Sequence, residues 1–418
     1  MQYIIIGAGP AGVVAAETLR KTDTDADITI IGDEPEPPYS RMAIPYYLIN
    51  NIAESGSYLR DPGSHFKNKR IEILQQPVVS VDTVNRQVKL ADGSHLSYDK
   101  LLLATGSRPM SPPIPGIELP QVQSCWTLKD ARAIIELAQP GAKVVLIGAG
   151  FIGCIILEAL VKRGVKLSVV ETGNRMVPRM LNEKAGGLIK QWCIDQGIDV
   201  HTSCSVKSIN AIDQGQVQVS LSDGTELNAA LVITATGVKS NVELLADSEV
   251  KIDQGVLVNR CMQTSNKDIY AAGDVAQGID FSTGNFEVQA IQPTATDHGR
   301  IAGFNMAGKV VEHQGTLNMN VLDTLGLVSC SFGLWMGVEG GEQCELYNAD
   351  QFQYINLQFD GDYLVGASSV GKTQHIGVLR GLIESKLNLG DWKERLKSDP
   401  TQIMEAYISC TQELGYGQ

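Results

Sequence analysis

A strand, a glycine-rich turn and a helix occur together twice in this chain, and the repeat constrains the fold more than any other feature. The two copies read MQYIIIGAGPAGVVAAETLR and KVVLIGAGFIGCIILEALVKRG. Their glycines are Gly7, Gly9 and Gly12, and Gly148, Gly150 and Gly153. In each copy the first glycine permits a tight turn, the second lets the backbone approach a pyrophosphate, and the third lets the helix pack against the strand. Each copy therefore predicts a dinucleotide-binding βαβ unit.

An acidic residue follows the second strand of each repeat. ITIIGDE places Asp33 and Glu34 there, and KLSVVE ends in Glu171. Such a carboxylate can accept a hydrogen bond from a ribose hydroxyl. The sequence does not choose between Asp33 and Glu34. Glu171 favours NADH over NADPH because a carboxylate repels a 2′-phosphate, although Arg175, four residues on, leaves NADPH open.

Two further strands end in Ala-Thr-Gly, in LLLATGSRP and LVITATGVKSN, and the first is followed by the proline-rich PMSPPIPG. A proline-rich stretch after a strand end indicates a crossover between domains. The last hundred residues alternate β-prone runs with turns and end in two short helical stretches. We expect an α/β fold with two Rossmann-like domains, the outer one from 1–113 and 242–315 and the inserted one from 114–241, plus a C-terminal α+β domain at 316–418.

Composition narrows the possible partners and the redox chemistry. The formal charge of −13 in 418 residues argues against nucleic acid and favours a cytoplasmic protein, and no apolar run reaches membrane-spanning length. The eight cysteines include no C-x-x-C or C-x4-C pair, which predicts reduced, mostly packed thiols. The six histidines form no metal-binding pattern, so we expect no metal site.

Five motifs stand in an order that resembles the flavoprotein reductases of the pyridine nucleotide-disulfide oxidoreductase superfamily: GAGPAG, ATGSRP, GAGFIG with Glu171, ATGVKSN and IYAAGDVA. PYSR, NRMVPRMLNEKAG and GTLNMNVLDTLGLVSCSFG look most like NAD(P)H:rubredoxin reductases and ferredoxin reductases. The resemblance covers essentially the whole chain. It implies FAD in the outer domain, NADH in the inserted domain, a C-terminal interface domain, and electron delivery to a small redox protein such as rubredoxin or ferredoxin.

The resemblance also implies roles for single residues in FAD binding. Gly7, Gly9 and Gly12 would hold the pyrophosphate, and Asp274 would bind the ribityl chain. A helix from about Thr294 to Ala307 would aim its N-terminus at the flavin. Arg41 is a candidate second clamp on the pyrophosphate, with a solvated surface charge as the alternative. The resemblance also implies FAD contacts by five further residues, namely Thr105, Gly106, Arg108, Gly273 and Ala295. It implies NAD contacts by Gly148, Gly150, Gly153 and Glu171.

The segment PPYSRMAIPYYL departs from the resemblance at the position of reactive residues. Relatives with one reactive cysteine carry it before GLPYY, and aligning that segment here places Met42 at the cysteine. A thioether cannot form a sulfenate or a mixed disulfide, so we expect no redox-active cysteine. Ferredoxin-reductase-like relatives carry a lysine where this chain has Tyr46. Pro45 and Tyr46 would then form an uncharged wall beside the isoalloxazine.

Two more departures leave the acceptor open. Ile155 replaces a family acid near the nicotinamide, and Gln292 replaces an aromatic residue before the flavin-facing helix. Ile155, Pro45 and Tyr46 are thus flavin-facing candidates, but no residue need act as a nucleophile, because hydride passes from the nicotinamide to flavin N5. His298 is expected to be a partly exposed structural histidine, with a flavin-facing position as the alternative.

The sequence leaves open two other functions. One is direct NADH oxidase or reductase activity toward oxygen, a nitric-oxide-linked centre or a sulfur compound. The other is a redox-sensing flavoprotein scaffold with little turnover. A homodimer also stays open.

Overall fold

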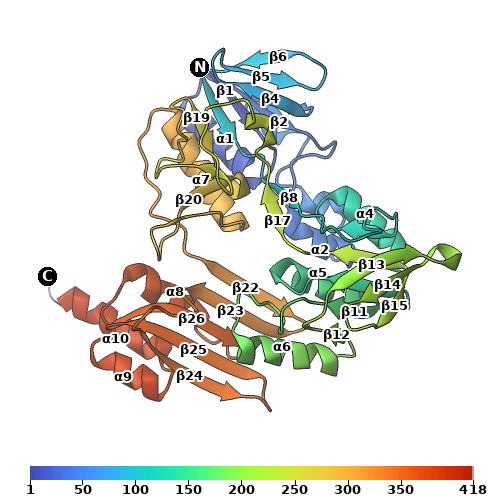
Figure 1. The fold of residues 1–418 in the computed structure, drawn as a ribbon. Helices are drawn as coiled ribbons and strands as arrows, with labels where there is room; N and C mark the ends of the chain where they lie inside the picture. The colour runs from blue at the N-terminus through green and yellow to red at the C-terminus, as the bar shows by residue number, and fades with distance from the viewer. Residues whose placement is uncertain (417–418) are drawn as a thin grey trace. The chain divides into compact units, whose positions relative to one another are not determined.

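The computed structural model describes residues 1–416, which divide into two compact units (Figure 1). The first unit consists of Met1–Met110 and Val238–Thr316, and the second of Ser111–Gly237 and Leu317 onward. The chain therefore crosses between the units near residues 110, 237 and 316. The assignment of FAD-binding, NAD-binding and interface roles to the expected domain ranges stays a prediction.

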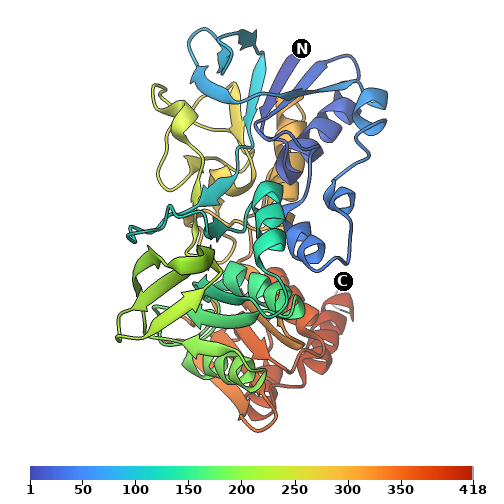
Figure 2. The same ribbon diagram turned by 90° about the vertical axis from the view of Figure 1, so that its right-hand side faces the viewer.

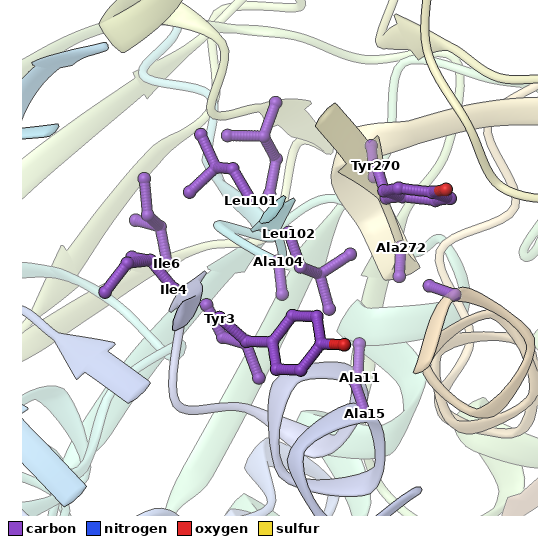
Figure 3. Packing of buried hydrophobic residues seen from close by; sticks show 14 of the residues in the cluster. Tyr3, Ile4, Ile6, Ala11, Ala15, Leu101, Leu102, Ala104, Tyr270 and Ala272 are labelled. Atoms are coloured by element: carbon purple, nitrogen blue, oxygen red, sulfur yellow. The ribbon is translucent and has the colours of Figure 1, made fainter. Parts of the chain in front are cut away.

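A five-stranded parallel sheet in the order β19-β7-β1-β2-β3 forms the centre of the first unit. Its strands are β1 (Gln2–Ile6), β2 (Asp27–Gly32), β3 (Ile71–Gln75), β7 (Lys100–Leu103) and β19 (Ile269–Ala271). All of these strands except β3 are buried on both faces, which explains their continuous apolar runs. Figure 3 shows Ile4, Leu101, Leu102 and Tyr270 packed in this core.

Helices α1 (Pro10–Thr22) and α7 (Gln292–Met306) pack against one another beside this sheet. A Cβ on Gly299 would lie 2.2 Å from the carbonyl oxygen of Ala11, and one on Gly303 would lie 2.9 Å from that of Ala15. Only glycine permits so close an approach of two helix backbones. The two helices, about 270 residues apart in the sequence, are thereby packed closely together at Ala11 and Ala15 of α1 and at Gly299 and Gly303 of α7.

The remaining elements of the first unit are short. Two small helices are α2 (Ile44–Leu48) and α3 (His65–Asn68). The antiparallel strands are β4 (Val78–Asp82), β5 (Gln87–Leu90) and β6 (His95–Ser97), then β8 (Ser107–Pro109) with β17 (Val238–Ser240). Strand β18 (Val256–Leu257) pairs in parallel with β20 (Ala276–Ile279), which pairs antiparallel with β21 (Phe286–Glu287).

The second unit repeats the parallel sheet in the order β12-β11-β10-β16-β9. Its strands are β9 (Val122–Ser124), β10 (Lys143–Ile147), β11 (Lys166–Val170), β12 (Asp199–His201) and β16 (Leu231–Thr234). The helices are α4 (Leu128–Leu137), α5 (Phe151–Lys162) and α6 (Glu183–Asp195). A separate antiparallel sheet contains β13 (Val206–Ala211), β14 (Val217–Leu221) and β15 (Glu226–Ala229).

The C-terminal part of the second unit is an antiparallel sheet in the order β22-β23-β26-β25-β24 with helices on one face. The strands are β22 (Met319–Thr324), β23 (Leu327–Gly333), β24 (Glu342–Asn348), β25 (Gln353–Asp360) and β26 (Tyr363–Val370). The helices are α8 (Ile376–Ser385), α9 (Asp391–Ser398) and α10 (Ile403–Tyr416). The expectation of two terminal helices was wrong, because Lys386 and Gly390, both with positive φ, separate α8 from α9.

Helix α6 joins the two parts of the second unit, as Figure 2 shows for the green helix beside the orange strands. Asn182 Nδ2 donates to the Tyr354 hydroxyl at 2.6 Å, and Lys184 forms an ion pair with Glu345. The rings of Trp192 and Phe352 meet edge to face at 5.1 Å. The inserted Rossmann sheet and the C-terminal sheet are thus held together by polar and aromatic contacts.

Candidate dinucleotide-binding sites

The first glycine of each loop packs against one of the two Ala-Thr-Gly motifs. Gly7 has φ +119°, and a Cβ there would lie 2.0 Å from the carbonyl oxygen of Ala104. Gly148 has φ +102°, and its Cβ would lie 2.5 Å from that of Ala235. No other residue type fits either place. The repeated Ala-Thr-Gly motif, which the sequence indicated only as a strand end, is therefore the support of each glycine loop.

The other glycines divide into a packing position and an open position. A Cβ on Gly12 would lie 2.0 Å from the Gly7 oxygen, and one on Gly153 would lie 2.1 Å from the Gly148 oxygen. By contrast, a Cβ on Gly9 or Gly150 would meet nothing within 4 Å. Space beside the second glycine is what a pyrophosphate approaching the backbone requires. Both loops therefore fit the dinucleotides that the sequence predicted.

The two helices that begin at these loops, and α7 as well, have no side-chain cap at their N-termini. Helices α1, α5 and α7 have no side-chain cap and no acidic residue in the first turn. By contrast, α4 has a capping box at Thr127, and Asn182 caps α6. The uncapped N–H groups, with the partial positive charge of the helix end, suit a phosphate or an electron-rich ring edge.

Glu171 is buried and bound to backbone, which the sequence did not indicate. Its Oε2 accepts a hydrogen bond from the Ala149 N–H at 2.7 Å, and its Oε1 accepts one from the Gly173 N–H at 2.7 Å. The carboxylate thus holds the glycine loop to the segment that follows β11. Arg175 does not reach out as a phosphate ligand would, because it donates to the Leu181 carbonyl at 2.8 Å and the Pro178 carbonyl at 3.1 Å.

The corresponding place in the first unit holds no acid. The strand registers pair Ile147 with Val170 and Ile6 with Ile31, so Gly32 occupies the position of Glu171. Asp33 and Glu34 follow one and two residues later. Asp33 is exposed, whereas Glu34 is half-buried and accepts hydrogen bonds from Tyr39 and Arg41.

Three elements of the first unit converge at Gly273-Asp274. A Cβ on Gly273, at φ +76°, would lie 3.3 Å from the Cβ atoms of both Ala11 in α1 and Ala295 in α7. Ser107 donates to Asp274 Oδ2 at 2.7 Å. Burial raises the pKa of the Asp274 carboxyl, while the Ser107 hydrogen bond and the Arg41 charge act in the opposite direction. The structure thus places Asp274 beside the N-termini of both helices.

Helix α7 begins where the sequence placed it, with Pro293 in its first turn. Thr294 and Ala295 are buried there. Gln292 accepts a hydrogen bond from Ser40 at 2.5 Å, across 252 residues of sequence. Ser40 was absent from the sequence-predicted site, and no local pattern could have indicated this contact.

The residues after β7 are bound to the returning chain. Thr105 Oγ1 donates to the Asn241 carbonyl at 2.8 Å, and Gly106 has φ +65°. Arg108 donates to Asn241 Oδ1 at 2.7 Å and to Glu243 Oε2 at 2.9 Å. These bonds fix the crossover at β8 and β17. Contacts of Thr105, Gly106 and Arg108 with FAD stay predictions.

The predicted flavin-facing residues differ in exposure. Met42 is 49% exposed and Tyr46 56% exposed, one helical turn apart, while Ile44 and Leu48 point into the protein. Pro45 is half-buried. Ile155 is half-buried on α5 of the second unit. The first-unit residues therefore present an uncharged surface at α2.

His298 is buried, so the expectation of partial exposure was wrong. Its ring is 3% exposed and meets that of His313 edge to face at 4.8 Å. Its Nε2 lies 3.4 Å from Thr316 Oγ1, and its Nδ1 has no hydrogen-bond partner among the described residues. Burial lowers the pKa of His298 to about 3. The reason for burial is that segment 309–316 folds back over this face of α7.

The thiols are mostly enclosed. Six of the eight cysteines are buried, and Cys125 and Cys261 are half-buried. Burial raises the pKa of Cys125, Cys193 and Cys330 to about 12, which favours the unreactive thiol over the thiolate.

Two glycine loops with supporting strands, two uncapped helices and a third helix directed at the first loop define an FAD-dependent NAD(P)H oxidoreductase. The family described as pyridine nucleotide-disulphide oxidoreductase matches residues 1–297. The chain belongs to this family. The fold class and the superfamily resemblance are confirmed, and FAD and NADH are its expected cofactors.

Similar proteins extend over nearly the whole chain. The NADH-dependent phenylglyoxylate dehydrogenase subunit epsilon of Aromatoleum evansii is 31% identical over 413 residues, covering 98% of both chains. An NADH oxidase of Methanocaldococcus jannaschii is 35% identical over 330 residues, or 77% of this chain and 73% of the relative. The reductase in the covalent putidaredoxin reductase–putidaredoxin complex is 25% identical with a TM-score of 0.90, covering 98% of this chain and 99% of that one.

Among the helices that the structure describes, none combines the length and apolarity needed to cross a membrane.

Proposed function

We propose that this protein passes a hydride from NADH to FAD and sends the electrons on, one at a time, to a small redox protein of the rubredoxin or ferredoxin type. The observation that carries the proposal is Met42. Its side chain is exposed, and the resemblance of the surrounding segment predicts that it occupies the position of the reactive thiol in single-cysteine relatives. Because a thioether can form neither a sulfenate nor a mixed disulfide, we expect no transfer of electrons to sulfur at this position.

The enclosed cysteines support the same function. A disulfide or peroxide reductase needs an accessible thiolate of low pKa, whereas burial raises the pKa of Cys193 and Cys330 to about 12. When bound, FAD supplies hydride acceptance and one-electron release. The chain's own residues would contribute binding and orientation, through the glycine loops, the N-terminus of α7 and the half-buried Asp274.

The names of similar proteins support a protein partner. One solved relative is a reductase covalently joined to putidaredoxin, and another relative is named as a subunit of an NADH-dependent dehydrogenase. We infer that the acceptor of this chain is likewise a protein, either diffusing or held as a neighbouring subunit. A cytoplasmic location and the absence of a nucleic-acid partner belong to the same proposal.

Anaerobic mixing of the FAD-loaded protein with NADH tests the first half of the proposal. We expect rapid bleaching of the flavin absorbance, faster with NADH than with NADPH. A panel of acceptors, namely rubredoxin, ferredoxin, oxygen and disulfides, then tests the second half. Turnover only with an iron–sulfur or rubredoxin-type protein supports the proposal. Prompt disulfide reduction would contradict it.

A matched control uses the two least buried thiols. The double variant Cys125→Ser/Cys261→Ser should keep full turnover with the protein acceptor, because neither thiol takes part. Loss of turnover would point to sulfur chemistry that the proposal excludes.

A second candidate function is direct reduction of a small molecule, which the similarity to an NADH oxidase favours. Tyr46 and Met42 leave an exposed apolar surface at α2 that a small oxidant could approach. Fast reoxidation by oxygen without any added protein would favour this candidate.

Slow reduction by NADH would instead favour a redox-sensing scaffold with little turnover. The elution volume of the purified chain would decide whether it is a homodimer.

A further inference from the structure

Val177, in the segment 172–182 between β11 and α6, has a backbone conformation that its residue type disfavours. Its φ is +44°, in the left-handed region, and its side chain is 1% exposed. Branching at Cβ makes this region unfavourable for valine, so a valine keeps such a φ only where the surrounding structure enforces it. The contacts of Val177 therefore indicate what the strained conformation supports.

The strained backbone of Val177 directs its N–H to the second glycine loop. This N–H donates to the carbonyl oxygen of Ala149, the residue between Gly148 and Gly150, at 2.8 Å. The N–H of Ala149 donates in turn to Glu171 Oε2 at 2.7 Å. The peptide groups on both sides of Ala149 are thus bound to the chain that follows β11.

The first glycine loop is not held in this way. Ala8, between Gly7 and Gly9, is the counterpart of Ala149, and its backbone N–H and carbonyl form no hydrogen bond within the described residues 1–416. Ala149 is fully buried, whereas Ala8 is half-buried. The two bonds to Ala149 are therefore a property of the loop expected to bind NADH and do not belong to glycine loops in general.

Arg175 closes the turn that follows Val177. Its Nε donates to the Leu181 carbonyl at 2.8 Å, and its Nη2 donates to the Pro178 carbonyl at 3.1 Å. The N–H of Leu181 donates to the Val177 carbonyl at 3.0 Å. A guanidinium suits this place because its N–H groups are fixed in one plane and can bind two carbonyls at once. The side chain of Arg175 thus fixes the turn that begins at the strained residue.

The same turn is packed tightly on α6. A Cβ on Gly186, near the start of α6, would lie 2.6 Å from the carbonyl oxygen of Met176 and 3.1 Å from the Cβ of Arg175. Only glycine permits this approach. The residues on both sides of Arg175 and Val177 are therefore held in place, which is the condition under which backbone strain persists.

We propose that Arg175 and Val177 are positioning residues for NADH: Arg175 braces the turn, and the strained Val177 holds the Ala149 peptide groups. The second glycine loop would then have its binding conformation before NADH arrives, so that binding loses no free energy in ordering the loop. Because the loop is expected to contact the pyrophosphate, which NADH and NADPH share, the brace should affect both equally.

This inference deepens the proposed function and rests on it only for the binding of NADH at the second loop. A protein that binds NADH but reduces no protein acceptor would overturn the proposed function and leave the inference intact.

Calorimetric titration of the FAD-loaded protein with NAD⁺ and NADP⁺, which bind without reducing the flavin, tests the brace. We expect Arg175→Met to weaken both about tenfold, to raise the KM for NADH by the same factor and to leave kcat and the FAD content unchanged. Arg175→Lys, which keeps one donor group, should recover part of the affinity. An unchanged affinity would overturn the proposal, and so would a loss confined to NADP⁺, because Arg175 would then be a ligand of the 2′-phosphate.

Arg179→Met is the matched control for the loss of a positive charge in the same segment. Arg179 is exposed, and its side chain forms no hydrogen bond or ion pair in the part of the chain that the structure describes. This variant should bind NAD⁺ as the wild type does. A tenfold loss in Arg179→Met as well would overturn the brace, because charge alone would then explain the effect of Arg175.

Thermal unfolding of two valine variants tests the strain. Val177→Ala and Val177→Gly both remove the two methyl groups, but only glycine adopts a positive φ freely, so Val177→Gly should melt about 3 °C higher than Val177→Ala. At Val169, a buried position in β11 without a positive φ, the order should reverse. The same order at both positions would contradict the strain.

NAD⁺ binding by Val177→Gly separates positioning from stability. Glycine relieves the strain but no longer holds the N–H in one direction, so we expect NAD⁺ to bind about threefold more weakly than in the wild type. Wild-type affinity in Val177→Gly would overturn the positioning role of Val177.

Discussion

The two glycine loops of this protein share their backbone and differ in what surrounds it. In both, the first glycine packs on an Ala-Thr-Gly strand end, and the second leaves open space. In the first unit Gly32 replaces the acid, and α7 covers α1 through Gly299 and Gly303. In the second unit Glu171 binds the loop directly. The shared backbone fits the pyrophosphate that FAD and NADH have in common, and the different surroundings fit our expectation that the two loops bind different cofactors.

This difference fits a division between a lasting and a passing ligand. In the first unit the distant helix α7 and the turn Gly273-Asp274 pack beside the start of α1, as suits a cofactor that stays bound. The second loop, besides its support by Ala235, is bound directly by the carboxylate of Glu171, as suits a substrate that enters and leaves in every turnover.

The largest effect is expected from the packed glycine of the first loop. Gly7→Ala would force a Cβ to within 2.0 Å of the Ala104 oxygen at positive φ, so we expect a loss of about 4 kcal/mol of folding free energy or no folded protein. Gly9→Ala, two residues on, is the control and should fold. Thermal unfolding of both variants measures this. Equal stability of the two would contradict the packing described for Gly7.

A smaller loss is expected at the acid of the second loop. Glu171→Gln exchanges one carboxylate oxygen for an NH2 group, which leaves a buried backbone N–H without an acceptor and costs about 2 kcal/mol. Unfolding in urea should show the loss of stability in Glu171→Gln, and the KM for NADH should change as well. Gly32→Ala, at the corresponding place of the first unit, would meet only Ala8 Cβ at 3.1 Å and should cost much less. Equal losses of stability in Glu171→Gln and Gly32→Ala would contradict the difference described between the two loops.

The open glycines should separate the two cofactors. A methyl at Gly150 enters space that a pyrophosphate needs, so Gly150→Ala should raise the KM for NADH about tenfold and leave FAD bound. Gly9→Ala should weaken FAD and leave the affinity for NADH unchanged. Equilibrium binding of each cofactor to each variant measures the four values. A loss of both cofactors in either variant would show that the loops are not independent.

A more gradual effect, spread over two pH units, is expected from acid and concerns the first unit. The pKa of His298 is about 3 in the folded protein, below its ordinary value near 6.5, so the unfolded chain takes up the proton first. Stability should therefore fall by about 1 kcal/mol per pH unit as the pH drops from about 6 to 4. Release of FAD reports this unit. The four tryptophans, Trp126, Trp192, Trp335 and Trp392, all lie in the second unit and should respond less.

His298→Leu should remove this acid sensitivity, while His95→Gln, at an exposed site, should keep it. A wild type whose FAD release is independent of pH between 6 and 4 would contradict the burial described for His298. The hydrogen bond with His313 lowers the pKa of Asp297 to about 2. Asp297 therefore loses its contribution to folding stability only below the range from pH 6 to 4.

Local patterns in the sequence predicted the local parts of these sites. The glycine loops, the acid after β11 and the start of α7 follow from spacing and from Pro293, because each depends on a few adjacent residues. The support of Gly7 by Ala104 and the hydrogen bond between Ser40 and Gln292 depend on segments far apart in the chain. No periodicity encodes those contacts. The sequence did not predict the third terminal helix, because the break between α8 and α9 depends on a positive φ at Lys386. Lysine as a residue type does not indicate that conformation.

The contact between α1 and α7 has a consequence for the order of folding. Helix α1 ends at residue 22, but the glycines that seat α7 on it are not made until about 280 residues later. The parallel sheet of the inserted region, by contrast, is complete by residue 234. Because long sequence separation slows the formation of native contacts, the inserted sheet should form first during synthesis. The glycine loop of the first unit is therefore synthesised first, but the native packing around it should form last.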